Sequence, residues 1–216
     1  MSRTLRLLAG LVLAGFVAGC GAETVWAPDE EIQRAAYSTS GPPTVTLLTM
    51  VSNVNGSGGH SALVIDGAQR LVFDPAGSWH HPLVPERNDV LFGLTPQLYQ
   101  FYMDYHARET YHVVVQEVTV TPEQAARLSA LVQGYGPVAR ANCTRSISDV
   151  LSQTPGFEGL GRTWFPNRLR DSFATLPGVT ETQVFDDDSD DNLELLQAQA
   201  RAARTLEIAQ GIAARD

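Results

Sequence analysis

The chain has 216 residues and a formal net charge of −9, with 15 basic side chains against 24 acidic ones. An acidic chain without a basic cluster argues against a nucleic-acid-binding protein. The length suits one domain with a single sizeable hydrophobic core once an N-terminal leader is set aside.

The first residues have the features of an export signal. Arg3 and Arg6 precede an apolar run over residues 7–17, which is too short to span a bilayer comfortably. The run ends in Val-Ala-Gly-Cys at residues 17–20, and this ending resembles a bacterial lipobox. The alternative is an ordinary secretory signal that ends in a chance cysteine.

The lipobox resemblance implies a location for the protein. It implies a lipoprotein signal peptide over residues 1–19, cleavage before Cys20, and a thioether-linked diacyl lipid, with palmitate-type chains, on the Cys20 sulfur. Gly21 follows Cys20, which favours the outer membrane under the common bacterial sorting rule. We therefore expect a lipoprotein of the cell envelope that faces the periplasm and contacts the membrane through Cys20.

The next residues predict a tether and the start of the domain. Residues 20–43 are polar and close on Ser-Thr-Ser-Gly-Pro-Pro, which predicts a tether. The β-branched and apolar residues 44–52 predict a strand, and a glycine-rich loop follows over residues 53–59. Two short apolar runs, residues 60–65 and 69–74, flank Asp-Gly and predict a β-hairpin.

The remainder predicts helices around one more strand. A Thr-Pro cap opens a predicted helix over residues 95–108, and residues 112–121 form the strongest predicted strand. Further helices are predicted over residues 121–135, 142–152, 165–176 and 192–214. The order predicts an α+β fold, with a small antiparallel sheet and its helices over residues 44–180. An acidic linker and a C-terminal helix follow over residues 181–216.

Cys143 is the only cysteine outside the export signal. A free cysteine is commonly a small buried hydrophobic residue. Cys143, however, follows the good helix cap Asn142 and so lies in a first helical turn, where free N–H groups and the helix dipole stabilise a thiolate. A lone exposed thiol is a liability in an oxidising compartment unless it is used or shielded. On these grounds, a catalytic role for Cys143 and its simple burial are equally good interpretations.

A cysteine nucleophile needs a base, and His60 is the best placed of the five histidines. It begins a strand directly after the glycine-rich loop, where backbone without side chains leaves room for a substrate. His80 and His81 lie in a Trp-Pro loop and are predicted at the surface or in a lid. His106 ends a helix, where a cation suits the dipole, and His112 is predicted to be structural.

Asp74 is the candidate third residue, because an imidazole base is usually oriented by another polar group. A three-residue hairpin loop would pair Ile65 with Gln69 and place His60 opposite Asp74 on one face of the sheet. A two-residue turn would instead point Asp74 away from His60. The simpler interpretation of Asp74 as a turn residue before a proline stays open.

Two segments together resemble a known superfamily. They are Gly-Gly-His-Ser-Ala-Leu-Val-Ile and its continuation over residues 58–77, and Ala-Asn-Cys-Thr-Arg-Ser and its continuation over residues 141–151. They resemble the circularly permuted papain-like superfamily, which includes permuted NlpC-type peptidases and lecithin–retinol acyltransferase-like proteins. The resemblance covers roughly residues 44–151. It implies His60 as the base, Cys143 as the nucleophile and Asp74 as the orienting residue, although the family more often has histidine or another polar group there.

The resemblance implies thiol chemistry on an amide, ester or thioester carbonyl. Peptidoglycan stem peptides and lipid acyl groups are both near an outer-membrane anchor, with a slight preference for peptide amides because the tether directs the domain toward the wall. The alternative is a non-catalytic envelope lipoprotein that uses the fold as a binding or structural module. No cofactor is predicted. No metal site is predicted either, because the histidines lack a compact ligand spacing and the acidic run at residues 186–191 lacks an EF-hand pattern.

Overall fold

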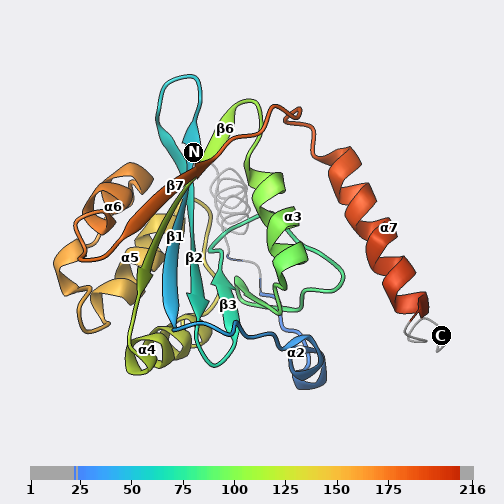
Figure 1. Cartoon of the computed structure of the whole chain (residues 1–216), viewed down its shortest axis with the longest axis horizontal. Coiled ribbons are helices and arrows are strands. Elements are labelled where there is room, and N and C mark those ends of the chain that lie inside the picture. Colours follow the sequence, from blue (N-terminus) through green and yellow to red (C-terminus); the bar gives the residue numbers. More distant parts are fainter. Residues whose placement is uncertain (1–21, 23, 210–216) are drawn as a thin grey trace, which may run out of the picture.

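One antiparallel sheet is the frame of the molecule. The computed structural model describes residue 22 and residues 24–209. Its strands are β1 Thr44–Ser52, β2 Gly58–Asp66, β3 Arg70–Phe73, β4 Glu86–Arg87, β5 Val90–Phe92, β6 Tyr111–Thr119 and β7 Thr180–Val184. These seven strands are ordered β4-β5-β3-β2-β1-β6-β7 (Figure 1). The predicted α+β class with an antiparallel sheet is confirmed.

The helices occupy both faces of this sheet. They are α2 Asp29–Ala35, α3 Pro96–His106, α4 Pro122–Gln133, α5 Cys143–Ser152, α6 Pro166–Phe173 and α7 Leu193–Ala209, with a turn of 3-10 helix, η1, at Glu158–Leu160. Two predicted caps are confirmed. The Thr95 hydroxyl accepts from the Leu98 N–H at 3.4 Å, and Thr121 with Gln124 forms a capping box at the start of α4. Within the described residues, no helix is both long enough and apolar enough to cross a membrane.

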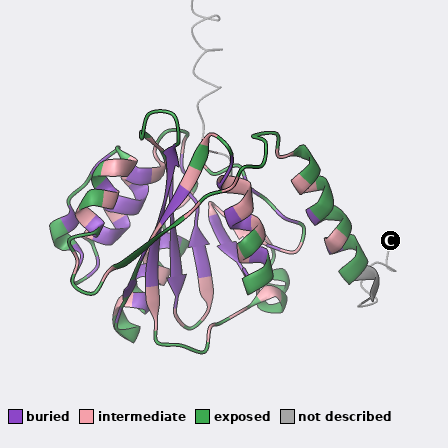
Figure 2. Ribbon diagram, turned by 45° about the horizontal axis from the view of Figure 1, so that its top comes forward, coloured by how far each residue is buried: buried purple, intermediate pink, exposed green. Residues whose placement is uncertain are grey.

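Alternate strand residues face two separate cores, which explains why the central strands are apolar on both sides. Val45 and Leu47 of β1 point toward the core that α4, α5 and α6 complete. Leu48 and Met50 point toward the other core, which α3 completes. Figure 2 shows the buried central strands between these two sets of helices. Any residue on β2 therefore faces either α5 or α3 according to its parity.

Part of the predicted tether lies against the domain. The Ala27 N–H donates to the Glu86 carbonyl at 2.9 Å, and the Asn88 N–H donates to the Val25 carbonyl at 3.0 Å. Further along, the Tyr37 carbonyl accepts from the backbone N–H of Arg70 at 2.7 Å. These backbone contacts hold residues 25–37 on the β4 and β3 side of the sheet, so this part of the predicted tether packs on the domain.

The C-terminal segment also joins the sheet. Residues 180–184 form the edge strand β7 beside β6, so the prediction of a linker that begins at residue 181 is wrong for this segment. This strand was missed because its Thr-Glu-Thr-Gln-Val sequence is polar and mostly exposed. The acidic residues then cross to α7, which lies beyond α3 in Figure 1.

Ile147 tests how firmly α5 is held on the sheet. Its side chain is fully buried in the core on the α5 face. We expect Ile147→Ala to lower the free energy of unfolding by about 2–5 kcal/mol and Ile147→Val by about 0.5–1.5 kcal/mol, measured by urea denaturation. The exposed Val54→Ala should change it by less than about 0.5 kcal/mol. Equal stability of Ile147→Ala and the parent chain would contradict this packing.

Candidate active site

His60 and Asp74 form a hydrogen-bonded pair. His60 Nε2 donates to Asp74 Oδ1 at 2.6 Å, and the side chains are 20% and 2% exposed. Of the two hairpin alternatives, the three-residue loop correctly places both side chains on one face, but the register given for it is wrong. Asp66 pairs with Arg70 across a three-residue loop, so Asp74 lies diagonally from His60 rather than directly opposite. The diagonal distance is within reach of an imidazole and a carboxylate.

The Asp74 carboxylate is fixed by the loop that follows β3. The Gly77 N–H donates to the Asp74 carbonyl at 3.0 Å, which folds the loop back over the side chain. A Cβ atom at Gly77 would lie 2.2 Å from Asp74 Oδ2, so only glycine leaves room for the carboxylate. Burial raises the pKa of Asp74, but the charge and the hydrogen bond of His60 together lower it by more. The pKa of Asp74 is therefore below its ordinary value. Asp74 is therefore the ionised partner of His60.

Cys143 reaches this pair because β3 is short. β3 pairs with β2 only from Leu63 to Asp66, so within the described residues no strand covers the outer edge of residues 58–62. The first turn of α5 lies at this edge, where the Ser61 and Thr144 hydroxyl oxygens are 3.1 Å apart and both side chains are buried. The Ser61 backbone N–H and the Thr144 hydroxyl both stabilise the Cys143 thiolate, with Thr144 Oγ1 at 3.8 Å from Cys143 Sγ.

Asn142 does not cap α5 through its side chain, contrary to the sequence prediction. Its Nδ2 instead donates to the carbonyls of Ala139 and Arg140, at 3.3 and 3.1 Å. Ala141 has a φ of 62°, which turns the chain sharply just before the helix. The first-turn N–H groups beside Cys143 are therefore not taken up by the Asn142 side chain.

The electrostatics of the site favour an ion pair. Burial raises the pKa of the Cys143 thiol, but the hydrogen bond and charge of His60 lower it more, from an ordinary 9.0 to about 7. Burial lowers the pKa of His60, whereas the Asp74 charge and hydrogen bond raise it, to about 10. Between these two values the pair is a thiolate beside an imidazolium. Because Nε2 is bonded to Asp74, Nδ1 is the nitrogen left for the sulfur.

Asp89 is a positioning residue that the sequence analysis missed. Its carbonyl accepts from the Asp74 N–H and its Oδ1 accepts from the Ala76 N–H, both at 2.8 Å. Its Oδ2 accepts from the Val138 N–H, also at 2.8 Å. One carboxylate thus joins the loop that carries Asp74 to the segment that leads into Cys143. No local sequence pattern signals this role, because the three partners come together only in the fold.

A second half-buried histidine, His106, lies next to the pair. His106 was predicted as a cation at a helix end, but burial lowers its pKa to about 4, despite the opposing effect of Asp74, and the ring is neutral at pH 7. Its ring centroid is 6.1 Å from that of His60. Helical periodicity could have indicated the burial, because Leu98 and Tyr102 lie on the same stripe of α3. His81, predicted at the surface, is also buried, between Trp79 and Phe101.

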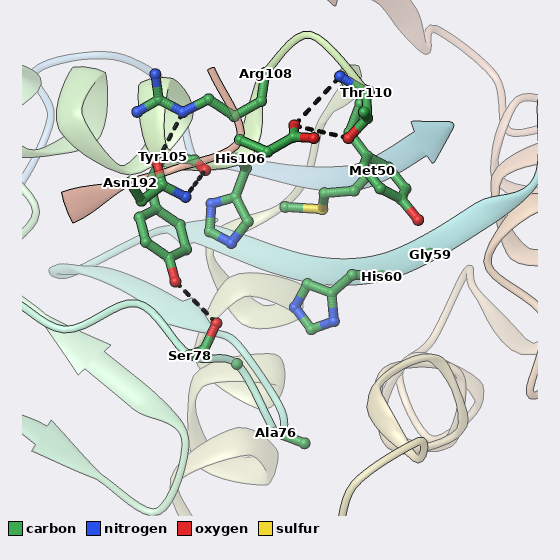
Figure 3. A pocket seen from close by; sticks show the side chains of 13 residues that line it. Met50, Gly59, His60, Ala76, Ser78, Tyr105, His106, Arg108, Thr110 and Asn192 are labelled. Carbon is green, nitrogen blue, oxygen red and sulfur yellow. Dashed lines mark hydrogen bonds between the residues drawn. The ribbon is translucent and has the colours of Figure 1, made fainter. Parts of the chain in front are cut away.

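A pocket of about 460 Å³ opens onto His60 and His106 (Figure 3). Its other lining residues are Met50, Gly59, Ala76, Gly77, Ser78, Tyr105, Arg108, Thr110, Tyr111, Asp190 and Asn192. The acidic segment before α7 forms one wall. Asp190 Oδ1 accepts from the Thr110 hydroxyl at 2.7 Å, and Asn192 Oδ1 accepts from Arg108 Nε at 2.7 Å. Cys143 is not among the lining residues, so the pocket meets the site on the histidine side.

Comparison with known proteins gives no relative: no family model, curated protein or solved structure matches the chain. The papain-like resemblance accordingly remains a prediction. Cys20 and the signal peptide lie outside the described residues, so their assignment also remains a prediction.

The pKa values predict how the reactivity of the Cys143 thiol depends on pH. We expect iodoacetamide to alkylate Cys143 with a rate that rises through pH about 7, because the thiolate forms there. In His60→Ala the thiol keeps its burial but loses the imidazolium, so its pKa should rise to 9 or above. The rate at pH 7 should then fall roughly 50-fold. Mass spectrometry of the Cys143 peptide measures the rate separately from Cys20, and identical pH profiles for the two chains would contradict the ion pair.

A substitution at Gly77 tests the geometry around Asp74 without replacing a charged residue. Gly77→Ala should displace the Asp74 carboxylate and weaken its support of the imidazolium, so the thiol pKa rises. A rise of one unit would slow alkylation at pH 7 roughly five-fold. Gly159→Ala is the matched control, because nothing lies within 4 Å of its added Cβ. The close-packed loop is contradicted if both variants react like the parent chain.

Proposed function

We propose that this protein is a thiol hydrolase or acyltransferase that acts on an amide or ester carbonyl. The observation that carries the proposal is the 2.6 Å hydrogen bond between His60 Nε2 and Asp74 Oδ1, beside a thiol whose pKa the same imidazole lowers to about 7. Nucleophile, base and orienting carboxylate come from α5, β2 and the loop after β3. A buried structural cysteine needs none of these partners.

In this mechanism the Cys143 thiolate attacks the carbonyl carbon and forms a new C–S bond. The tetrahedral intermediate collapses when the bond to the leaving nitrogen or oxygen breaks, and His60 gives that atom the proton on Nδ1. His60 then removes a proton from water or another acceptor, which attacks the thioester carbonyl. Cleavage of the C–S bond releases the acyl product and restores the thiolate. Asp74 keeps the ring oriented and compensates its charge throughout.

The start of α5 supplies the group that would stabilise the oxyanion. The Cys143 backbone N–H lies in the first turn, where helical N–H groups have no carbonyl partner within the helix. A developing negative charge on the carbonyl oxygen is favoured there by the N–H and by the helix dipole. The Asn142 side chain does not compete for this position, because its amide bonds to carbonyls upstream.

The pocket supports a substrate with a polar acyl portion. Hydroxyl groups of Ser78 and Tyr105 are 3.0 Å apart on one wall, and Asp190 and Arg108 lie on another. A purely apolar acyl chain would leave these groups without solvent, which is costly. Peptidoglycan stem peptides, which are rich in amides and charges, suit this lining better than a lipid chain. An outer-membrane lipid anchor at Cys20 would keep the domain within reach of that substrate.

Turnover tests the proposal. The full chain should hydrolyse amide bonds in purified stem-peptide fragments, or a p-nitrophenyl ester as a general acyl substrate. Cys143→Ala should abolish turnover, and His60→Ala should lower kcat/KM by about 10²–10⁴-fold because the proton donor and acceptor is lost. His112→Gln is the matched control, since His112 contacts Asn53 outside the site.

Two results would decide against an enzyme. Turnover that persists in Cys143→Ala would assign the activity to another group or to a contaminant. A thiol that resists iodoacetamide at pH 6 to 8 in the parent chain would favour the non-catalytic binding or structural module instead.

A further inference from the structure

His60, Asp74 and His106 present three metal-ligating atoms to one point. One ligand atom from each residue lies within 4.8 Å of the other two. They come from β2, the loop after β3 and the end of α3, so no sequence spacing signals the cluster. A tetrahedral Zn²⁺ with bonds of about 2.0–2.1 Å needs ligand atoms roughly 3.3 Å apart. Side-chain adjustments of about an ångström would therefore close the three atoms around an ion.

The orientation of His106 supports a ligand role. Its Nδ1 donates to the Tyr102 carbonyl at 2.8 Å, which leaves Nε2 with a lone pair and fixes the ring. A hydrogen bond from the second ring nitrogen to a backbone carbonyl is the usual arrangement for a metal-binding histidine. Figure 3 shows the His106 ring beside the pocket, facing the side where His60 lies.

Two buried oxygen atoms lie close together beside the two histidines. They are Asp74 Oδ2 and the Tyr102 hydroxyl, and both side chains are at least nine-tenths buried. The Tyr102 hydroxyl is a hydrogen-bond partner of the Asp74 carboxylate, which lowers the pKa of Asp74 and raises that of Tyr102. Asp74 offers one carboxylate oxygen to the cluster, and a carboxylate can bind a cation through one oxygen while the other accepts a hydrogen bond.

We propose that His60, Asp74 and His106 bind a divalent transition-metal ion of the Zn²⁺ type. The ion enters through the pocket, which both histidines line. His60 Nε2 releases its proton to solvent when the metal binds, and the Asp74 carboxylate changes from a hydrogen-bond acceptor to a metal ligand. Two neutral imidazoles and one carboxylate leave a fourth position for water.

The metal would switch off the thiol chemistry, a consequence that rests on the proposed function. A metal on Nε2 leaves His60 with its remaining proton on Nδ1 and removes the Asp74 hydrogen bond that supports the imidazolium. The ring then has no lone pair for the thiol proton and is a weaker acid toward the leaving group. Zn²⁺ should therefore slow turnover, and a chelator should restore it.

Metal binding is measured first in the full chain carrying Cys143→Ala, so that the thiol cannot be the ligand. We expect one equivalent of Zn²⁺ by isothermal titration calorimetry and a tetrahedral absorption spectrum with Co²⁺. His106→Gln in the same background should weaken binding by more than about 100-fold, since losing a ligand costs more than losing an outer hydrogen bond. His80→Gln, at an exposed histidine, is the control and should bind like its parent.

The outcomes separate this proposal from the enzymatic one. Absence of Zn²⁺ binding in Cys143→Ala, or equal binding with His106→Gln, overturns the metal site whatever the turnover assay gives. Binding that depends on His106 supports the site even in a chain without turnover. In an active chain, Zn²⁺ should inhibit the parent at least ten-fold more strongly than His106→Gln, and equal inhibition of both would overturn the proposed switch.

Discussion

The hydrogen bond between His60 and Asp74 is the interaction on which the rest of the site depends. An ionised carboxylate that is 2% exposed is costly unless a charge or donor compensates it, and His60 is that donor. The same contact keeps the imidazole protonated, and the imidazolium in turn stabilises the Cys143 thiolate. The protonation states of these three residues, which are far apart in the chain, thus depend on one another. A change at any of them alters the pKa values of the other two.

The sheet allows Cys143 to approach His60 because β3 pairs with only part of β2. Because β3 ends before it reaches the start of β2, the edge around Ser61 is open and the first turn of α5 occupies it. The odd residues of β2 then face α5 and the even residues face α3. His60 lies on the α3 face near the start of the strand, where its ring can contact groups from both sides. A longer β3 would separate the thiol from the imidazole.

The environment of Asp74 offers the carboxylate two partners that exclude each other. It can accept the proton of His60 Nε2 and support thiol chemistry. In the proposed metal site it instead binds a cation together with His106, which removes His60 from that chemistry. The pocket that would admit a substrate opens onto both histidines, so the two uses share an entrance. The second use follows from packing on α3 and leaves the thiol itself unchanged.

The sequence by itself determined the features that depend on local patterns: the α+β class, the central strands, and the capped starts of α3 and α4. It did not determine the register of the hairpin, and with it whether Asp74 faces His60, nor did it determine strand β7 or the neutral state of His106. Polar residues such as those of β7 become a strand only when β6 offers an edge, and a histidine becomes neutral only when neighbours exclude water from it. Long-range contacts decide these features, and only for His106 does the sequence carry a local signal, the helical spacing that puts it on the same stripe of α3 as Leu98 and Tyr102.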